Sequence, residues 1–454
     1  MRCAPCECNL GLKVCSFYQN TDKIETLRLP RLRWGLTMTS LIVHFNRPTN
    51  RKFLKQYEWR CHGEKEAQSM LKQIKRMLLW LRRLLKNAIY ILLAPCYYIC
   101  CLRPVRKGLV VLADGHIDRL PYSMQALRER LTEIDDITVV EYFHDYSFCN
   151  MIKGFWIMLR FMPLYARAEY VFLCDCFIPT TCCKKRKGTT VVQLWHSCGL
   201  MKKVGVDSPE DAMSMKKTQY RNTDVFTTSA DVVSDVLSKA LLIPRENFST
   251  AGVNRMDLLY RKDRCASLKK YFYENYPEYR GKKLVLWAPT FRGNVHDSHL
   301  VGEEVLLKLQ KELGEDYAII LKTHRFAGRT GIDTPVRITA EQLLTIADCL
   351  ITDYSSIYFD YLYFRKPVIL FAPDLQEYEE KRGIYPKYTD TPGYFAENEV
   401  QLRKGILTMD TWANEAYRAQ QDKLWDEQMT FCDGKSTDKL LKELGILKND
   451  EVSA

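Results

Sequence analysis

The sequence predicts an α/β protein with two doubly wound, Rossmann-like domains, preceded by a basic amphipathic helical segment. Three observations support this fold class: short apolar runs of strand length, helical stretches between them, and a restart of the alternation near Gly252. Runs that are apolar throughout are typical of parallel strands that helices cover on both faces. A length of 454 residues is enough for two domains with full cores.

Positive charge is concentrated in the first part of the chain. The formal net charge of the whole protein is +12. Residues 1–107 hold 21 lysines and arginines against 6 aspartates and glutamates, a net of +15, and the remainder holds 46 against 49, a net of −3. A protein that binds nucleic acid is expected to carry a basic face on its folded domains. The nearly neutral body therefore disfavours nucleic acid as a partner.

The N-terminal region divides into two parts. Residues 1–69 show no sustained periodicity, so we expect a poorly ordered extension that is dispensable for activity. Residues 70–103 place lysines, arginines and Trp80 between apolar residues at helical spacing, a pattern typical of a helix lying in an anionic membrane surface. The uncharged run at 88–102 contains Pro95 and is shorter than the about 20 residues of a membrane-spanning helix. We therefore predict peripheral membrane association; the alternative is a helix packed on the protein's own core.

Cysteine usage favours a reducing compartment. The 17 cysteines show no regular spacing, and residues 1–40 lack a cleavable secretory signal. Two clusters, at 3–8 and at 174–183, could hold a metal ion, but neither contains two C-x-x-C units. We predict no metal site and no cofactor, and the need for a divalent cation stays open.

The strands follow one another in two series. The first five are assigned to a domain at 104–252, and the last four to a domain at 253–454 that also holds the C-terminal helices. The predicted strands are Leu109–Ala113, Ile137–Phe143, Tyr170–Cys174, Thr190–Leu194, Val225–Thr228, Leu284–Ala288, Ala318–Lys322, Leu350–Thr352 and Val368–Phe371. In such folds ligands bind beyond the carboxyl ends of the strands, so we place the site there, between the domains.

One strand–helix–strand segment suggests a phosphate site. The apolar run Cys349–Thr352 is followed by a helical stretch, Ser355–Phe364, and then by a second apolar run, Pro367–Phe371. A helix N-terminus presents unpaired N–H groups and the positive end of the helix dipole, which favours phosphate. Ser355 and Ser356 add hydroxyl donors and a natural N-cap. The alternative is an ordinary capped helix without a ligand.

Polar residues follow three further strands at the same edge. They are His196 after the fourth strand, Thr290 and Arg292 after the sixth, and Lys322, Thr323 and His324 after the seventh. Each could be structural alone, but together they suit a substrate rich in negative charge, because arginine binds phosphate bidentately and histidine can act as a base near pH 7. The chain lacks P-loop, G-x-G-x-x-G, G-x-S-x-G and H-E-x-x-H motifs, which disfavours the enzyme classes they mark.

From Gly108 to Trp425 the ordered set of motifs resembles the CDP-glycerol glycerophosphotransferase family, whose members prime or polymerise wall teichoic acids. The motifs are Trp195-His196 with Lys202-Lys203-Val204-Gly205, Gly252-Val253-Asn254-Arg255-Met256-Asp257, Ala288-Pro289-Thr290-Phe291-Arg292, Lys322-Thr323-His324, Thr352-Asp353-Tyr354-Ser355-Ser356 with Asp360, and Arg382-Gly383-Ile384-Tyr385. The resemblance implies a GT-B-like fold, with an N-terminal acceptor domain and a C-terminal domain that holds the CDP-alcohol.

The resemblance also implies roles for individual residues. His196 would be the general base that deprotonates the acceptor hydroxyl, and His324 would stabilise charge on the donor phosphates. Ser355 and Ser356 would hold the pyrophosphate. Further donor or phosphate contacts would come from Arg255, Pro289, Thr290, Arg292, Lys322, Thr323, Asp360 and Arg382. The loop with Trp195, Ser197, Cys198 and Gly199 would face the acceptor.

The implied reaction is a displacement at the β-phosphorus of CDP-glycerol. A hydroxyl of a lipid-linked acceptor attacks, CMP leaves, and a phosphodiester forms at the cytoplasmic face of the cell membrane. Two departures from the family pattern are present. Ser197 and Cys198 stand where many members have glycine, which leaves the acceptor open, and Arg325 replaces a usual proline and adds a cation beside the donor site.

Three alternatives to this function remain open. They are a CDP-ribitol ribitolphosphotransferase, a GT-B glycosyltransferase or sugar-nucleotide enzyme, and an inactive membrane-associated scaffold.

Overall fold

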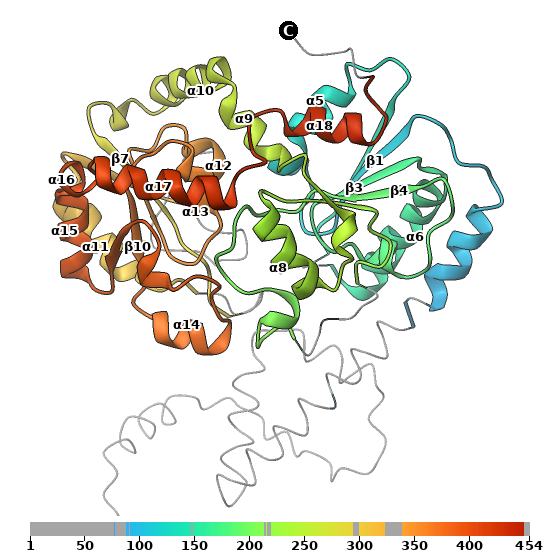
Figure 1. Ribbon diagram of the computed structural model, residues 1–454, viewed down its shortest axis with the longest axis horizontal. Helices are drawn as coiled ribbons and strands as arrows, with labels where there is room; N and C mark the ends of the chain where they lie inside the picture. The colour runs from blue at the N-terminus through green and yellow to red at the C-terminus, as the bar shows by residue number, and fades with distance from the viewer. Residues whose placement is uncertain are drawn as a thin grey trace, which may run out of the picture. The chain divides into compact units, whose positions relative to one another are not determined.

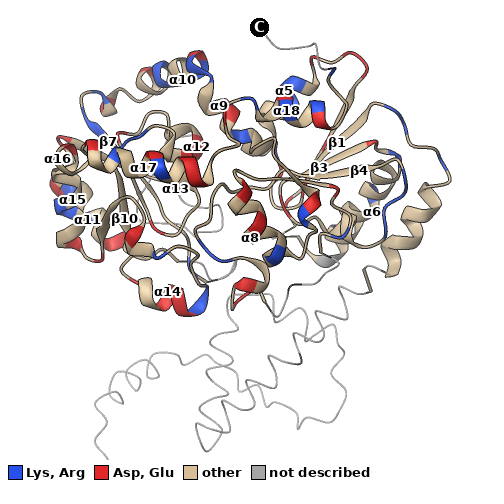
Figure 2. Cartoon of the chain, viewed as in Figure 1, with Lys and Arg blue, Asp and Glu red and all other residues tan. Residues whose placement is uncertain are grey.

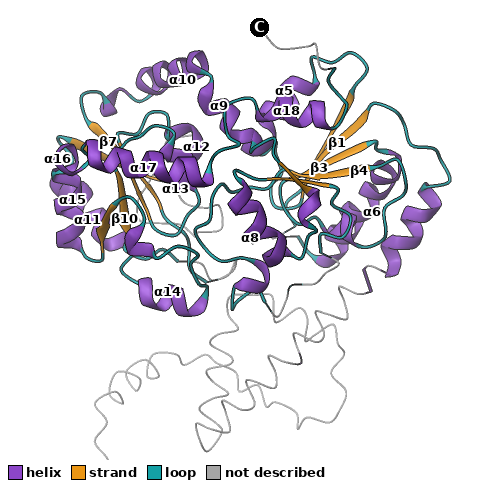
Figure 3. Cartoon of the chain, in the orientation of Figure 1, coloured by secondary structure: helices purple, strands orange, loops and turns teal. Residues whose placement is uncertain are grey.

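The computed structural model describes residues 88–89, 91–146, 149–212, 219–293, 299–322 and 338–448, together with Met77 and Met215. From residue 88 onward these residues belong to one compact unit. It contains two parallel β-sheets covered by helices, shown in Figure 1 and by secondary structure in Figure 3. The predicted extension at 1–69 and most of 70–87 lie outside the described residues.

The first sheet, within the described residues, has six parallel strands in the order β2-β1-β3-β4-β5-β6. Alternate residues of β1 face opposite sides: Val110 and Leu112 lie in one core, and Val111 and Ala113 lie in another. Helices therefore cover both faces, as the near-continuous apolar strands predict. The elements are β1 (Leu109–Asp114), α5 (Tyr122–Leu131), β2 (Thr138–Phe143), α6 (Met151–Arg167), β3 (Tyr170–Leu173), α7 (Ile178–Thr181), β4 (Thr190–Gln193), β5 (Val225–Thr227), α8 (Asp231–Leu241) and β6 (Phe248–Ser249).

The second sheet has five described strands, all parallel, in the order β11-β10-β9-β7-β8. It is also buried on both faces: Leu284 and Leu286 of β7 enter one core, and Val285 and Trp287 enter the other. The elements are α9 (Asp257–Tyr260), α10 (Lys262–Asn275), β7 (Lys283–Ala288), α11 (Glu303–Leu313), β8 (Tyr317–Leu321), α12 (Ala340–Leu343), β9 (Cys349–Thr352), α13 (Ile357–Leu362), β10 (Val368–Phe371), α14 (Leu375–Lys381), β11 (Tyr394–Ala396), α15 (Glu399–Leu407), α16 (Met409–Trp412), α17 (Glu415–Gln428) and α18 (Ser436–Glu443).

The two doubly wound parallel sheets confirm the predicted fold class. All nine predicted strands are present, with ends that differ by at most one residue. Two further strands, β6 and β11, are only two and three residues long, and runs so short have no recognisable apolar pattern. Acidic and basic side chains are interspersed over the helices, as the nearly neutral charge of the body predicts (Figure 2).

The last helix, α18, packs on the first sheet although it follows the strands of the second. Leu440 and Leu441 are fully buried in the same core as Val110 and Leu112 of β1. The C-terminal helices thus tie the two halves together, and α18 lies outside the half in which its sequence position places it.

Part of the predicted membrane segment is described. Residues 91–100 are helical through Pro95, and Leu93 and Tyr97 are fully buried against α6. The rings of Tyr97 and Tyr165 lie 4.8 Å apart between centroids. Other side chains of this helix are exposed. One face of the helix therefore packs on the protein's own core, and another face is exposed. Among the described helices, none has the length and apolar character needed to cross a membrane.

We expect Leu440→Ala to lower the free energy of unfolding by about 2–5 kcal/mol, because it leaves a cavity in the core under the first sheet. Denaturant unfolding measures this change. Val400→Ala is the control, since Val400 is 77% exposed and should lose about 0.5 kcal/mol or less. Equal effects of the two substitutions would contradict the packing of α18 on the first sheet.

Candidate active site

His196 stands beyond the carboxyl end of β4 on a strained turn. The preceding residue, Trp195, is buried and has a φ of 55°, which is rare for a bulky residue. Its ring lies 4.4 Å from the imidazole of His196 and 5.3 Å from Phe226, centroid to centroid. The buried indole holds this backbone conformation, while the His196 side chain remains 47% exposed.

The surroundings of His196 keep it neutral near pH 7. Partial desolvation by the surrounding protein lowers the pKa of His196 although about half of its side chain is exposed, and the charges of Lys202 and Arg255 lower it further, while Asp175 acts in the opposite direction. The Nδ1 atom of His196 lies 3.6 Å from Oδ2 of Asp175. Asp175 was not among the predicted residues. It follows β3, so the rule that pointed to the other strand ends could have found it.

A buried arginine joins the His196 turn to the second half. Arg255, in the 3₁₀ turn Asn254–Met256, places Nη2 2.8 Å from Oδ1 of Asp360 in α13. Its Nη1 donates to the carbonyl of His196, and Nη2 lies 3.8 Å from Sγ of Cys198. Burial acts to lower the pKa of Arg255, but the Asp360 carboxylate outweighs it and holds the pKa above its ordinary value. The guanidinium therefore stays charged.

Three of the residues with predicted roles are buried. Arg255 and Asp360 are 6% and 2% exposed and bind each other. Burial raises the pKa of Asp360, and the guanidinium opposes this. Cys198 is fully buried in the core of the second half, so its thiol does not face an acceptor. These three residues position the turn.

The remainder of the His196 turn is fixed by close contacts. Gly199 has a φ of +56°, and a Cβ atom there would lie 2.4 Å from the ring of Phe359 in α13. Its N–H donates to Oγ of Ser229 at 2.9 Å. The next residue, Leu200, donates its N–H to Oε1 of Gln428 at 2.8 Å. Ser197 directly follows His196 in this turn, and its polar side chain is half-buried.

Asp353 organises the carboxyl ends of β7 and β9. Oδ1 of Asp353 accepts the N–H of Thr290 at 2.8 Å and the N–H of Tyr354 at 2.6 Å. Oδ2 lies 3.0 Å from Nη2 of Arg292. Arg292 also pairs with both oxygens of Asp374, at 2.7 and 3.0 Å, and donates Nη1 to the carbonyl of Thr290 at 2.5 Å. Despite partial burial, Arg292 holds the pKa of Asp374 below its ordinary value.

Arg292, predicted to contact phosphate, is already engaged by protein groups in this structure. Its guanidinium is 11% exposed, is bound to two carboxylates, and lies 5.0 and 4.8 Å from the ring centres of Tyr354 and Tyr378. Arg382 is similarly engaged, with Glu210 at 3.1 Å and Asp211 at 2.7 Å, so a phosphate would have to displace these carboxylates.

The predicted hydroxyl residues Thr290, Ser355 and Ser356 lie around the Asp353 turn. Ser356 occupies the N-cap position of the six-residue helix α13, but its side chain makes no cap bond. Instead Oγ of Ser355 lies 3.4 Å from the N–H of Ile357. Oγ1 of Thr290 is buried and has no hydrogen-bond partner among the described residues. The capping prediction is therefore only partly correct, and the hydroxyl of Ser356 remains available to a ligand, whereas that of Thr290 is covered by surrounding atoms.

Lys202 is a cation that the sequence motifs contained but to which no role was given. Its backbone pairs with Ile384, and the flanking Lys203 N–H donates to the carbonyl of Gly383 at 3.0 Å. Burial and the charge of Arg382 lower the pKa of Lys202 to about 8, although Asp353 acts to raise it. A cation near both His196 and Asp353 would strengthen phosphate binding.

The remaining predicted residues are less informative. Pro289 follows β7, and Lys322 follows β8, where half-burial lowers the pKa of its ammonium group. Thr323, His324 and Arg325 lie outside the described residues. In the described part of the chain, no three histidine, cysteine, aspartate or glutamate side chains are grouped as metal ligands would be.

The sequence model of one family, described as CDP-glycerol:poly(glycerophosphate) glycerophosphotransferase, matches residues 96–445. The chain belongs to this family. Membership confirms the predicted family and enzyme class. The matched range includes both sheets and every predicted site residue.

Named relatives of this glycerophosphotransferase family member act in teichoic acid synthesis. The teichoic acid ribitol-phosphate primase of Bacillus spizizenii is 28% identical over 361 residues, which cover 75% of this chain and 91% of the relative. The teichoic acid glycerol-phosphate primase of Bacillus subtilis is 28% identical over 314 residues, 64% of this chain and 75% of the relative. The chain matches only 59% of the poly(ribitol-phosphate) polymerase of Bacillus spizizenii.

A solved structure has the same fold. The wall teichoic acid polymerase TagF superposes with a TM-score of 0.64 at 20% identity, over 85% of this chain and 98% of that chain. This likeness confirms the GT-B-like fold.

We expect Gly199→Ala to lower the free energy of unfolding by about 2–5 kcal/mol, through left-handed backbone strain and collision with Phe359. Gly281→Ala is the matched control: its φ is +78°, but the added Cβ meets open space, so only about 1–2 kcal/mol should be lost. Chemical denaturation compares the two. A smaller loss for Gly199→Ala than for Gly281→Ala would mean that the turn does not pack on α13 as described.

Proposed function

We propose that this family member transfers glycerol phosphate from CDP-glycerol to a hydroxyl group of a teichoic-acid-type acceptor and releases CMP. One observation carries the proposal: Arg255 binds both the carbonyl of His196 and the carboxylate of Asp360 in α13. This link would hold a neutral histidine and the hydroxyls near the start of α13 within reach of one substrate. Both are required for a phosphoryl transfer that depends on positioning and electrostatics.

In the proposed reaction His196 takes the proton of the acceptor hydroxyl as its oxygen attacks the β-phosphorus of the donor. The bond from that phosphorus to the bridging oxygen breaks, and the electron pair leaves with CMP. Thr290, Ser355 and Ser356 would bind the diphosphate oxygens, and Lys202 would offset the charge that develops on them. By resemblance to the family, Lys322, Thr323 and His324 would bind the donor on the β8 side.

CDP-ribitol is the second candidate donor. The support for it is the ribitol-phosphate primase of Bacillus spizizenii, which matches over 91% of its own length. Both donors share the CDP group and differ in the length of the alcohol, so the hydroxyls around Asp353 would bind either one. Selection between the two donors would therefore depend on the residues around the glycerol or ribitol group.

We propose a lipid-linked saccharide or polyol phosphate as the acceptor, reached at the cytoplasmic face of the cell membrane. Support comes from the basic amphipathic pattern at 70–103 and from the exposed apolar side chains of the described helix 91–100. Nucleic acid is not an expected partner, because the charge of the folded body is nearly balanced.

The proposal is tested with purified protein, a lipid-linked disaccharide acceptor, and isotopically labelled CDP-glycerol, CDP-ribitol or UDP-sugars. We expect CMP release and a product heavier by one alditol phosphate, seen by mass analysis. Sugar transfer from a UDP-sugar without phosphodiester formation would point to a glycosyltransferase. Absence of CMP release with every acceptor would point to an inactive scaffold.

We expect His196→Ala to slow CMP release by at least about a hundredfold, the usual scale for loss of a general base. Because the pKa of His196 lies below its ordinary value, wild-type turnover should fall only as the pH drops below about 6.5. His116→Ala is a matched control, since His116 has similar exposure and also lies near an aspartate. Near-normal turnover of His196→Ala would exclude the base role.

Lys202 predicts a second pH dependence, a loss of donor affinity at high pH, whereas His196 predicts a loss of turnover at low pH. Its pKa of about 8 means that the ammonium charge is lost as the pH rises through that value, so donor affinity should fall above about pH 8. Lys202→Met should weaken CDP-glycerol binding about tenfold or more at pH 7 and remove the pH dependence. Lys202→Arg should keep the affinity up to pH 10. Calorimetric titration with CDP-glycerol measures the affinity of the wild-type protein and of both variants. If the affinity of Lys202→Met also declined above pH 8, the decline would have to come from another group.

A further inference from the structure

The carboxylate of Asp175 lies beside one nitrogen of the His196 ring. Oδ2 of Asp175 is 3.6 Å from Nδ1 of His196. An ionised carboxylate accepts hydrogen bonds and cannot donate them, so the ring nitrogen that faces it is favoured as an N–H group. A neutral imidazole carries only one proton, so Nε2 then keeps a free lone pair. This is the form of the ring that a general base needs.

The Asp175 side chain is fixed by its own backbone. Oδ1 accepts the N–H of Cys176 at 2.7 Å, which leaves Oδ2 for the histidine. In the described part of the chain no lysine or arginine lies within ion-pair distance of Asp175, and its side chain is 38% exposed. The charge of this carboxylate is therefore not taken up by a permanent cation, and the titratable group that it meets is His196.

Two cations also face the imidazole. Partial desolvation lowers the pKa of His196, and the charges of Lys202 and Arg255 lower it as well. Asp175 raises the pKa, and so does a hydrogen bond to the backbone carbonyl of Cys174. Both of these opposing groups directly follow β3. A histidine that takes up a proton near two cations requires an anion to stabilise the imidazolium.

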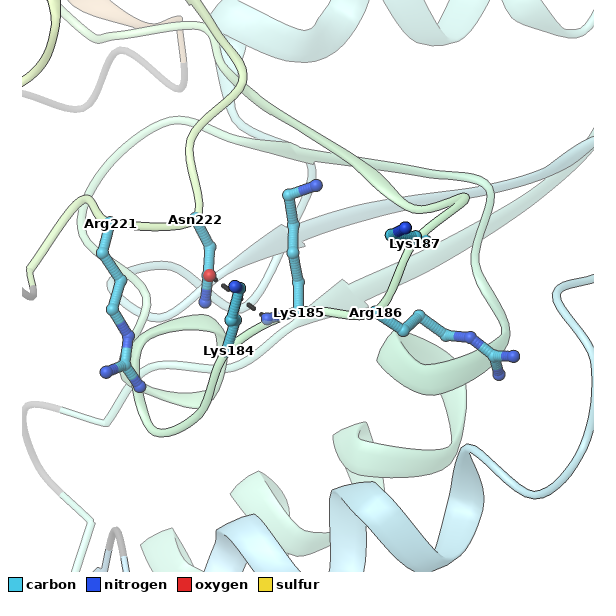
Figure 4. A pocket seen from close by; sticks show the side chains of 6 residues that line it. All are labelled: Lys184, Lys185, Arg186, Lys187, Arg221 and Asn222. Carbon is cyan, nitrogen blue, oxygen red and sulfur yellow. Dashed lines mark hydrogen bonds between the residues drawn. The ribbon is translucent and has the colours of Figure 1, made fainter.

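A larger group of cations lies at the other edge of the first sheet. Lys184–Lys187 and Arg221 line a pocket of about 420 Å³ together with Asn222 (Figure 4). Lys184–Lys187 precede β4 and Arg221 precedes β5, whereas His196 follows the carboxyl end of β4. The cations of this pocket therefore do not face the imidazole.

We propose that Asp175 is a positioning residue for the general base. It holds the His196 ring with Nδ1–H toward its own carboxylate and with Nε2 toward the acceptor hydroxyl. As the acceptor oxygen bonds to phosphorus and the bond to CMP breaks, Nε2 takes the hydroxyl proton. Asp175 stays ionised and stabilises the imidazolium, which later releases the Nε2 proton to water. This inference rests on the proposed function, because it takes His196 as the base.

The alternative is that Asp175 only stabilises the turn after β3 through the N–H of Cys176. Asp175→Asn separates the two roles. An asparagine oxygen can still accept the N–H of Cys176, so the turn is kept. The amide nitrogen in place of Oδ2 donates to Nδ1, which favours the opposite tautomer, with the proton on Nε2. The nitrogen that should act as the base is then blocked.

The tautomer can be measured without turnover, by long-range proton–nitrogen NMR of the full chain with isotopically labelled histidine. His196→Gln identifies the signals of His196 among those of the eight histidines. We expect the Nδ1–H tautomer in the wild-type protein, and the Nε2–H tautomer with a lower pKa of His196 in Asp175→Asn. An Nε2–H tautomer in the wild-type protein, or an unchanged tautomer in Asp175→Asn, would overturn the proposal.

CMP release gives a second readout. Asp175→Asn should slow it at least about tenfold at pH 7, while the affinity for CDP-glycerol changes less than about threefold, which shows that the variant folds. Asp175→Glu keeps a carboxylate and should recover part of the loss. Because removal of the anion lowers the pKa of His196, the fall in turnover of Asp175→Asn should begin about one pH unit lower than in the wild-type protein.

Glu141→Gln is the matched control. Glu141 has a side chain that is 39% exposed, close to the 38% of Asp175, and it pairs with Arg128 in the same half. Its loss should leave the rate and the pH profile unchanged. Normal CMP release by Asp175→Asn, together with an inactive His196→Ala, would overturn the role of Asp175 and leave His196 as the base. Near-normal release by His196→Ala would refute the proposed base and this inference with it.

Discussion

The candidate site depends on one buried charge, the guanidinium of Arg255. An arginine that is 6% exposed requires nearby acceptors, because transfer of an unpaired charge out of water costs several kcal/mol. Its guanidinium contacts the carboxylate of Asp360, the carbonyl of His196 and the sulfur of Cys198. One of these belongs to α13 and two to the turn after β4, so a single side chain fixes a helix of the second half against the turn that carries the histidine.

A second buried arginine does the same for the phosphate side. Arg292 is bound by Asp353 and Asp374, and Asp353 in turn accepts the backbone N–H groups of Thr290 and Tyr354. Both arginines are therefore used to hold the framework. Among the described residues, the groups that would be left to meet a substrate are the imidazole of His196, the ammonium groups of Lys202 and Lys322, and a few hydroxyls. Such a site would stabilise phosphate through fixed dipoles and one or two cations rather than through a cluster of arginines.

The fold could be predicted from sequence because buried parallel strands are apolar throughout, and nine of them were recognisable by that pattern alone. Strands β6 and β11 were not, since two or three residues carry no periodicity. The location of α18 was not predictable either, because a helix that packs on a distant sheet has the same amphipathic pattern as one that packs nearby.

The site was predictable at the level of strand ends, where His196 and Ser355 were recognised. The burial, ion pairing and pKa of each side chain were not predictable, because they depend on partners far away in the chain. The two carboxylates that bind Arg292 lie 61 and 82 residues further on. Lys202 stood in a recognised motif, but its lowered pKa comes from burial and from Arg382. The burial of Cys198 depends on its contact with the core of the second half.

A double-mutant cycle between Arg255 and Asp360 tests most directly whether this pair holds the site together. Arg255→Met and Asp360→Leu should each lower the free energy of unfolding by about 3–5 kcal/mol, because each leaves one buried charge unpaired. The double variant should recover at least about 2 kcal/mol of the summed loss. Its rate of CMP release should nevertheless stay low, since the bond to the His196 carbonyl is gone. Additive losses, or normal turnover in the double variant, would contradict the account.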